Sequence, residues 1–211
     1  MQIPFITAAG KEEKVGKRLQ KLVKEKDFDS IGKVLDKIQV PEGFKLAIHA
    51  VSKDEKYGMG AESYAVLISP DGEEILDKDK AFWKMLRVED SPEGAWQVYL
   101  LRNLWHYLPM FWHAFYEERI YVYSKDQLKK VLRYQPHFGD EPVPAFDLDK
   151  FEIKPVIWQE DDFWHVGAHY WSDFEGLVYE ELKISLSGKV HIYARPACRK
   201  TLHHYHCGIC F

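Results

Sequence analysis

The sequence lacks the features that mark several large classes of protein. It contains three cysteines, an odd number that does not suit a disulfide framework. No apolar run is long enough to cross a bilayer, and the first ten residues have neither the basic start nor the apolar stretch of a secretory signal. With 29 basic against 33 acidic residues, the chain also lacks the positive charge that phosphate contacts require. We therefore expect a soluble, cytoplasmic protein that binds neither nucleic acid nor membranes.

Well-known catalytic motifs are absent as well. The chain has no Gly-x-Ser-x-Gly elbow, no Walker loop, no His-Glu-x-x-His and no dinucleotide-binding fingerprint. The stretch Gly58-Met59-Gly60 lacks the further residues of a phosphate loop, so we interpret it as part of a hairpin loop. The sequence leaves open whether the protein is an enzyme.

What the chain does contain is enough apolar sequence for a full core, 46% of its 211 residues. Apolar residues at helical spacing predict a helix at 11–26, a shorter one from about residue 30 and another from Pro92, which follows a capping Ser91. Alternating or apolar runs predict strands at 44–52, 62–69 and 73–77. An aromatic-rich middle segment follows and should supply much of the core, with a strand at 119–124 and a helix at 125–134 after Ser124.

The C-terminal third has the pattern of antiparallel sheet. Strands are predicted at 151–159, 163–171, 177–186, 189–195 and 201–211. We predict an α+β fold with N-terminal helices and a small antiparallel sheet, an aromatic-rich middle segment and a C-terminal antiparallel β-meander. The chain forms either a single domain over 1–211 or two packed subdomains, 1–135 and 150–211, joined by the proline-, glycine- and acid-rich stretch 136–149.

The densest concentration of metal-ligand residue types lies in the last 21 residues, which hold all three cysteines and four of the ten histidines. If Pro196 to Lys200 forms a hairpin loop, His191 lies opposite the strand that carries His204 and His206. Three imidazoles could bind a zinc-like ion and leave one position for an activated water, which predicts a metal-dependent hydrolase or lyase. This site depends on strand register, because a slip of one residue moves His191 to the opposite face.

The cysteines offer a second, incompatible metal site. Cys207 and Cys210 form a Cys-x-x-Cys pair, which Cys198 and a histidine such as His203 would complete as a structural zinc site. Residues three apart on a strand point to opposite faces, so this site requires a bend at Gly208. The ordinary alternative is a terminal strand with core cysteines and half-buried histidines, and the three interpretations remain open.

A candidate ligand-binding group lies earlier in the C-terminal third. It consists of three tryptophans and two histidines: Trp158, Trp164, His165, His169 and Trp171. His165 and His169 would share one strand face, and the glycine and alanine between them would leave space for a ligand. Indole rings beside carboxylates are typical of carbohydrate platforms, although ordinary sheet histidines and acidic turns explain the same residues. Glu180 and Glu181 are neighbours on a predicted strand and so face opposite ways, which argues against a catalytic pair.

The resulting hypothesis is a soluble, non-enzymatic binding or interaction protein. Its ligand would be a protein, a small molecule or a carbohydrate, and the sequence specifies neither this ligand nor the oligomeric state. The alternative is the metal-dependent hydrolase or lyase with His191, His204 and His206 as zinc ligands.

Overall fold

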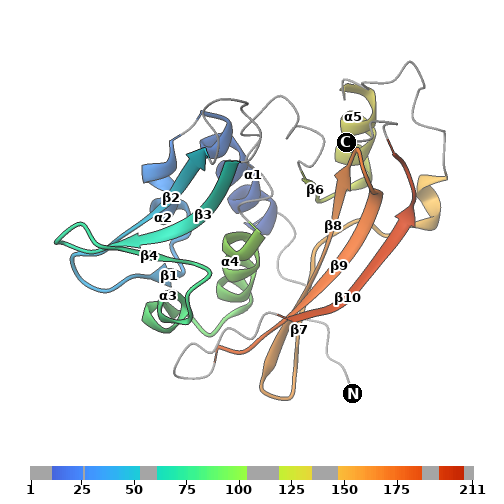
Figure 1. Cartoon of the computed structure of the whole chain (residues 1–211). Helices are drawn as coiled ribbons and strands as arrows, with labels where there is room; N and C mark the ends of the chain where they lie inside the picture. Colours follow the sequence, from blue (N-terminus) through green and yellow to red (C-terminus); the bar gives the residue numbers. More distant parts are fainter. Residues whose placement is uncertain are drawn as a thin grey trace.

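A computed structural model describes residues 11–25, 27–52, 61–103, 119–134, 147–186 and 195–206. It shows an α+β protein in which helix α4 lies between a three-stranded antiparallel sheet and a larger, C-terminal antiparallel sheet (Figure 1). The predicted fold class is confirmed. No helix in the described ranges is long and apolar enough to span a membrane.

The N-terminal half follows the predicted pattern closely. Its helical elements are α1 (Lys11–Glu25), the 3-10 turn η1 (Phe28–Ser30) and α2 (Ile31–Val34). Its sheet has the order β2-β3-β4, from β2 (Lys45–Ser52), β3 (Ala61–Ile68) and β4 (Glu74–Leu76). The structure adds three short elements that the sequence did not predict: β1 (Ile38–Gln39), α3 (Lys80–Met85) and β5 (Arg87–Val88). Segments this short have too few residues to show the spacing of apolar side chains that distinguishes a helix from a strand.

Two serines begin helices as expected. Helix α4 (Pro92–Asn103) follows Ser91, whose Oγ accepts a hydrogen bond from the Gly94 amide at 3.1 Å. Helix α5 (Lys125–Tyr134) follows Ser124, whose Oγ accepts one from the Gln127 amide at 3.2 Å. Each cap satisfies an amide that has no partner inside its helix. Strand β6 (Ile120–Val122) lies directly before α5.

The C-terminal sheet has the order β10-β9-β8-β6, and β7 also pairs with β8; every pairing is antiparallel. Its strands are β7 (Val156–Glu160), β8 (Phe163–Ser172), β9 (Gly176–Ile184) and β10 (Arg195–His203), and the 3-10 turn η4 (Leu148–Lys150) precedes them. The predicted loop at 196–200 is wrong, because these residues lie inside β10 and pair with β9. Pro196 lies beside a register shift in β10, at the edge of the described sheet, and edge strands and bulges are where sheets accept proline.

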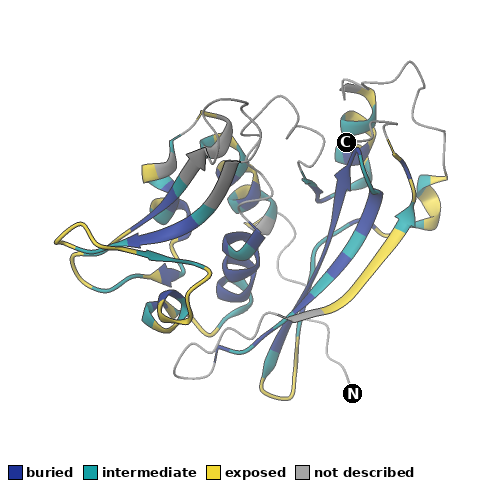
Figure 2. Ribbon diagram, in the orientation of Figure 1, coloured by how far each residue is buried: buried dark blue, intermediate teal, exposed yellow. Residues whose placement is uncertain are grey.

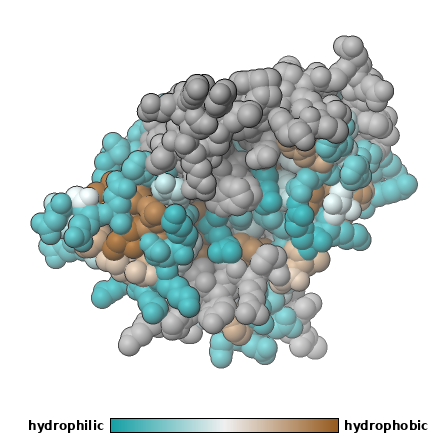
Figure 3. Space-filling model, viewed as in Figure 1, coloured by the Kyte–Doolittle hydropathy of each residue, from teal (hydrophilic) through white to brown (hydrophobic). Residues whose placement is uncertain are grey.

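One hydrophobic core joins the N-terminal elements, α4 and one face of the C-terminal sheet. It includes Leu19 of α1, Leu67 of β3, Trp96 of α4, Val166 of β8 and Val178 of β9. Figure 2 shows α4 and most of β8 as buried, whereas the middle of β10 is exposed. On the face of the molecule seen in Figure 3, hydrophobic residues gather mainly over the N-terminal half.

Aromatic side chains fill this core, as the composition predicted. Trp96 stacks on Tyr99 with ring centroids 5.2 Å apart, and Tyr99 meets the edge of Tyr121 at 5.6 Å. The predicted boundary stretch 136–149 lies mostly outside the described residues, so the choice between one domain and two subdomains stays a prediction.

Candidate functional site

The two faces of the C-terminal sheet differ in what they bury. Side chains alternate along β8, so Trp164 and Tyr170 lie on one face and His165, Gly167 and His169 on the other. We call the first the inner face, because Tyr170 and its neighbours belong to the core that contains α4. We call the second the outer face.

His165 is the best-anchored residue of the outer face. Its Nδ1–H donates to Glu181 Oε1 at 2.8 Å, across from β8 to β9. Its ring stacks on the indole of Trp158, with centroids 4.9 Å apart and planes 18° apart. Only 8% of the side chain is exposed, and Nε2 lies 3.7 Å from a Glu160 oxygen, too far for a hydrogen bond. Nε2 is therefore buried without a hydrogen-bond partner among the described residues, with the Glu160 carboxylate beside it.

His169 shares this face and is also buried, with 6% of its surface exposed. Its ring packs against Tyr179 of β9 at 5.1 Å between centroids. Burial lowers the pKa of His169 to about 4, so the imidazole is neutral at pH 7. Its Nδ1 and the Nε1 of Trp158 are likewise buried, and no described residue supplies them with a hydrogen-bond partner. These three residues, Trp158, His165 and His169, form what we call the outer-face cluster.

Gly167 separates the two histidines and determines what lies between them. A Cβ added at this position would overlap with the Tyr179 hydroxyl, so the absence of a side chain lets Tyr179 cross over β8. Burial raises the pKa of Tyr179 to about 12, which keeps the phenol neutral. The space that the sequence assigned to a ligand between His165 and His169 is therefore occupied by a tyrosine ring.

The two remaining predicted tryptophans have structural partners. Trp164 lies on the inner face, and its Nε1–H donates to Asp90 Oδ1 at 2.7 Å. Trp171 lies on the outer face but is completely buried, and its Nε1–H donates to Asp173 Oδ1 at 3.1 Å. Neither ring forms an exposed platform. Of the five predicted ligand-binding residues, the structure thus brings together Trp158 and His165, whereas His169 lies on the same face beyond Tyr179.

Sequence reasoning missed the most heavily bonded residue of the inner face, Glu180. Its carboxylate accepts hydrogen bonds from Tyr99 at 2.5 Å, from Tyr121 at 3.0 Å and from the Arg119 guanidinium at 3.1 Å. The same guanidinium lies 4.4 Å from the centre of the Tyr170 ring. Burial, and then the charge of Glu180, raise the pKa of Tyr121 well above its usual value. We call these groups the Glu180 network.

The predicted metal ligands are only partly within the described residues. Cys198 is exposed in β10, His203 is half-buried at its end, and His204 and His206 are exposed beyond it. His191, Cys207 and Cys210 lie outside the described residues. Within the described ranges, no group of three or more His, Cys, Asp or Glu side chains could hold a metal ion. Both zinc sites stay predictions, although the hairpin loop on which the His191 site was based is wrong.

Comparison with known proteins identifies no relative of this chain. No protein-family model, no curated protein and no solved structure matches this chain. Its function must be argued from the geometry of its own residues.

Proposed function

We propose that this protein is a non-enzymatic binding protein that holds a neutral, hydroxyl-rich small molecule, such as a carbohydrate, at the outer-face cluster. The observation that carries the proposal is the pair of buried ring nitrogens on the stacked rings of Trp158 and His165, which have no hydrogen-bond partner among the described residues; His169, with a third such nitrogen, lies beyond Tyr179 on the same face. A buried polar group with no partner costs about 1–3 kcal/mol. A ligand that supplies the missing partners would recover part of this cost.

The chemistry of the Trp158 and His165 nitrogens favours hydroxyl groups. The indole Nε1–H of Trp158 can only donate. His165 donates from Nδ1 to Glu181, so in the neutral ring its Nε2 can only accept. A hydroxyl group both donates and accepts, and several hydroxyls on one ligand would match both kinds of nitrogen.

The charge of the face favours a neutral ligand. His169 is neutral at pH 7, because burial lowers its pKa to about 4. The nearby ammonium of Lys183 lies 4.1 Å from the Phe163 ring centre, and the carboxylate of Glu181 is bonded to His165. Charges of both signs lie beside the cluster, since the Glu160 carboxylate is 3.7 Å from His165 Nε2 and Lys183 is a cation, so the face has no excess of one sign that would select a charged ligand.

Trp158 adds a surface for stacking. Its indole is half-buried, and one face of the ring is covered by His165. Strand β7, which carries Trp158, pairs with β8 alone in the described sheet. Aromatic faces pack well against the C–H groups of sugar rings, so this position suits a carbohydrate.

The test is a glycan array probed with the full chain, followed by calorimetric titration of the strongest hits. We expect His165→Gln to weaken binding by about tenfold, because one hydrogen bond to a buried group is lost. His49→Gln is the matched control, since His49 lies in the N-terminal sheet and is bonded to Glu74 at 2.9 Å. Equal affinities of both variants and the parent protein, or no saturable binding to any glycan, would contradict the proposal. One equivalent of bound zinc by elemental analysis would instead favour the metal-dependent alternative.

A further inference from the structure

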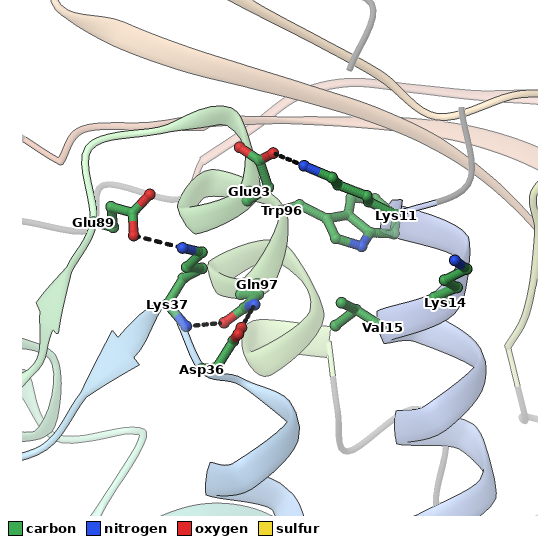
Figure 4. A pocket seen from close by; sticks show the side chains of 9 residues that line it. All are labelled: Lys11, Lys14, Val15, Asp36, Lys37, Glu89, Glu93, Trp96 and Gln97. Carbon is green, nitrogen blue, oxygen red and sulfur yellow. Dashed lines mark hydrogen bonds and ion pairs between the residues drawn. The ribbon is translucent and has the colours of Figure 1, made fainter. Parts of the chain in front are cut away.

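A pocket of about 380 Å³ lies between α1 and α4, on elements separate from the outer-face cluster (Figure 4). Its walls come from the first two turns of α1, from the segment after α2 and from the start of α4. The volume falls in the range of small-molecule sites and corresponds to roughly a dozen water-sized volumes.

The polar wall of this pocket is already fixed by internal hydrogen bonds. Gln97 is 2% exposed; its Oε1 accepts from the Lys37 amide at 2.7 Å, and its Nε2 donates to Asp36 Oδ1 at 2.7 Å. The Lys37 ammonium donates to Glu89 at 2.7 Å. Such a wall needs little rearrangement when a ligand enters, which lowers the cost of binding.

The pocket is lined by three carboxylates and three ammonium groups, of which two of each are paired. Glu89 is paired with Lys37, and Glu93 lies 3.6 Å from Lys11. The remaining carboxylate, of Asp36, accepts from Gln97. No ion pair or hydrogen bond to a described residue reaches the ammonium of Lys14, and none is drawn to it in Figure 4. Among the described residues, Lys14 is therefore the ammonium of the pocket that has no paired carboxylate.

An apolar surface lies next to the Lys14 ammonium. Val15 follows Lys14 on α1 and faces α4, where the ring of Trp96 lines the pocket (Figure 4). Val15 is half-buried, so part of its surface remains available for contact. Burying such surface under a ligand stabilises the complex by about 25 cal/mol per Å².

We propose that this pocket binds a small organic monoanion: a compact apolar body of about a dozen non-hydrogen atoms that carries one carboxylate. The carboxylate pairs with Lys14, and the apolar body lies against Val15. A dianion is disfavoured, because Glu89 and Glu93 line the same pocket. This site is independent of the function proposed for the outer face.

The test compares two probes that differ only in charge, indole-3-acetate and its neutral isostere indole-3-acetamide, titrated into the full chain by calorimetry. A partly exposed ion pair supports a preference of about fivefold for the acetate. Lys14→Met should abolish this preference while leaving the acetamide affinity unchanged. Lys17→Met is the matched control, because Lys17 lies on the same helix and is paired with Glu13 at 2.5 Å. The Lys17→Met variant should keep the preference for the acetate over the acetamide.

A second variant tests the location of the apolar body. Val15→Phe should fill the pocket and weaken both probes by the same factor, with thermal unfolding as the check that the chain remains folded. Equal affinity of the parent protein for the two probes, a preference that survives Lys14→Met, or no saturable binding at about 10 mM probe would overturn the proposal.

Discussion

The inner and outer faces of the C-terminal sheet bury polar side chains in opposite ways. On the inner face, the carboxylate of Glu180 accepts hydrogen bonds from two tyrosines and an arginine. On the outer face, the ring nitrogens of Trp158, His165 and His169 are buried without partners. Since β8 and β9 contribute to both faces, the difference comes from the partners that each face meets rather than from the strands.

The contrast separates polar groups that stabilise the fold from those that do not. The Glu180 network joins α4, β6 and β9, so it connects layers that are distant in the chain. Glu181, the next residue, bonds to His165 on the neighbouring strand. A fully bonded polar network rigidifies a core, whereas unpaired buried groups lower stability and need another explanation. For the outer face, we propose that ligand binding is this explanation.

The largest expected effect comes from breaking the Glu180 network. Glu180→Gln removes the charge that pairs with Arg119, whose side chain is only 16% exposed. Leaving such a cation without its partner should lower the free energy of unfolding by about 4 kcal/mol. Urea denaturation followed by circular dichroism measures the change. Glu181→Gln is the control, and its loss should be about 1 kcal/mol. Equal losses for the two variants would remove the distinction between the faces.

Acid should destabilise the protein through the outer face. His169 has a pKa of about 4 when folded, below the ordinary value of 6.5 that applies when the chain is unfolded. The unfolded chain therefore takes up this proton first as the pH falls. The contribution of His169 to stability is complete above pH 6.5 and is lost progressively between pH 6.5 and 4, with a total of about 3 kcal/mol.

The variant His169→Phe isolates this contribution. It keeps an aromatic ring at the same place but cannot be protonated, so its stability should fall less than that of the parent protein over the same pH range. Burial also lowers the pKa of His203, but that residue is present in both proteins and its effect cancels in the difference. Parallel stability curves for the two proteins, measured by urea denaturation at several pH values, would show that His169 is not buried in its neutral form.

Two tyrosines on one chain segment provide a smaller, matched comparison. The hydroxyl of Tyr121 donates to Glu180, whereas the hydroxyl of Tyr123 is buried without a partner. Removing a bonded hydroxyl and removing an unbonded one should change the free energy of unfolding in opposite directions. We expect Tyr121→Phe to lower the free energy of unfolding by about 2 kcal/mol, and Tyr123→Phe to leave it unchanged or raise it slightly. A loss of stability in Tyr123→Phe equal to that in Tyr121→Phe would indicate that both hydroxyls are paired.

Much of the fold follows from local sequence, because periodicity and caps act over a few residues. Ser91 and Ser124 begin helices as predicted, and the period of two places His165 and His169 on one face. The loop expected at 196–200 is instead part of β10, where Pro196 lies on a strand at the edge of the described sheet, a position that tolerates proline.

The candidate site depends on contacts between residues that are far apart in the chain, and local sequence patterns do not reveal such contacts. Glu180 lies 81 residues from Tyr99, with which it is bonded, and only the folded chain brings them together. One local signal was present: Glu180 alternates with Val178 and Leu182, where the pattern requires an apolar residue. A charge at such a position predicts a buried partner, but it does not identify that partner. Likewise, the pairing of His169 with Tyr179 depends on the register of β8 and β9.

The smallest effect concerns the contact that fills the outer face between the two histidines. Gly167→Ala would place a Cβ against the hydroxyl end of the Tyr179 ring, which can shift but would lose contacts. We expect a loss of about 1 kcal/mol in the free energy of unfolding. Tyr179→Phe removes the hydroxyl that the new Cβ meets, so Gly167→Ala should cost less in that background. A double-mutant cycle of the two substitutions measures the coupling. Strict additivity would mean that the tyrosine does not lie over Gly167.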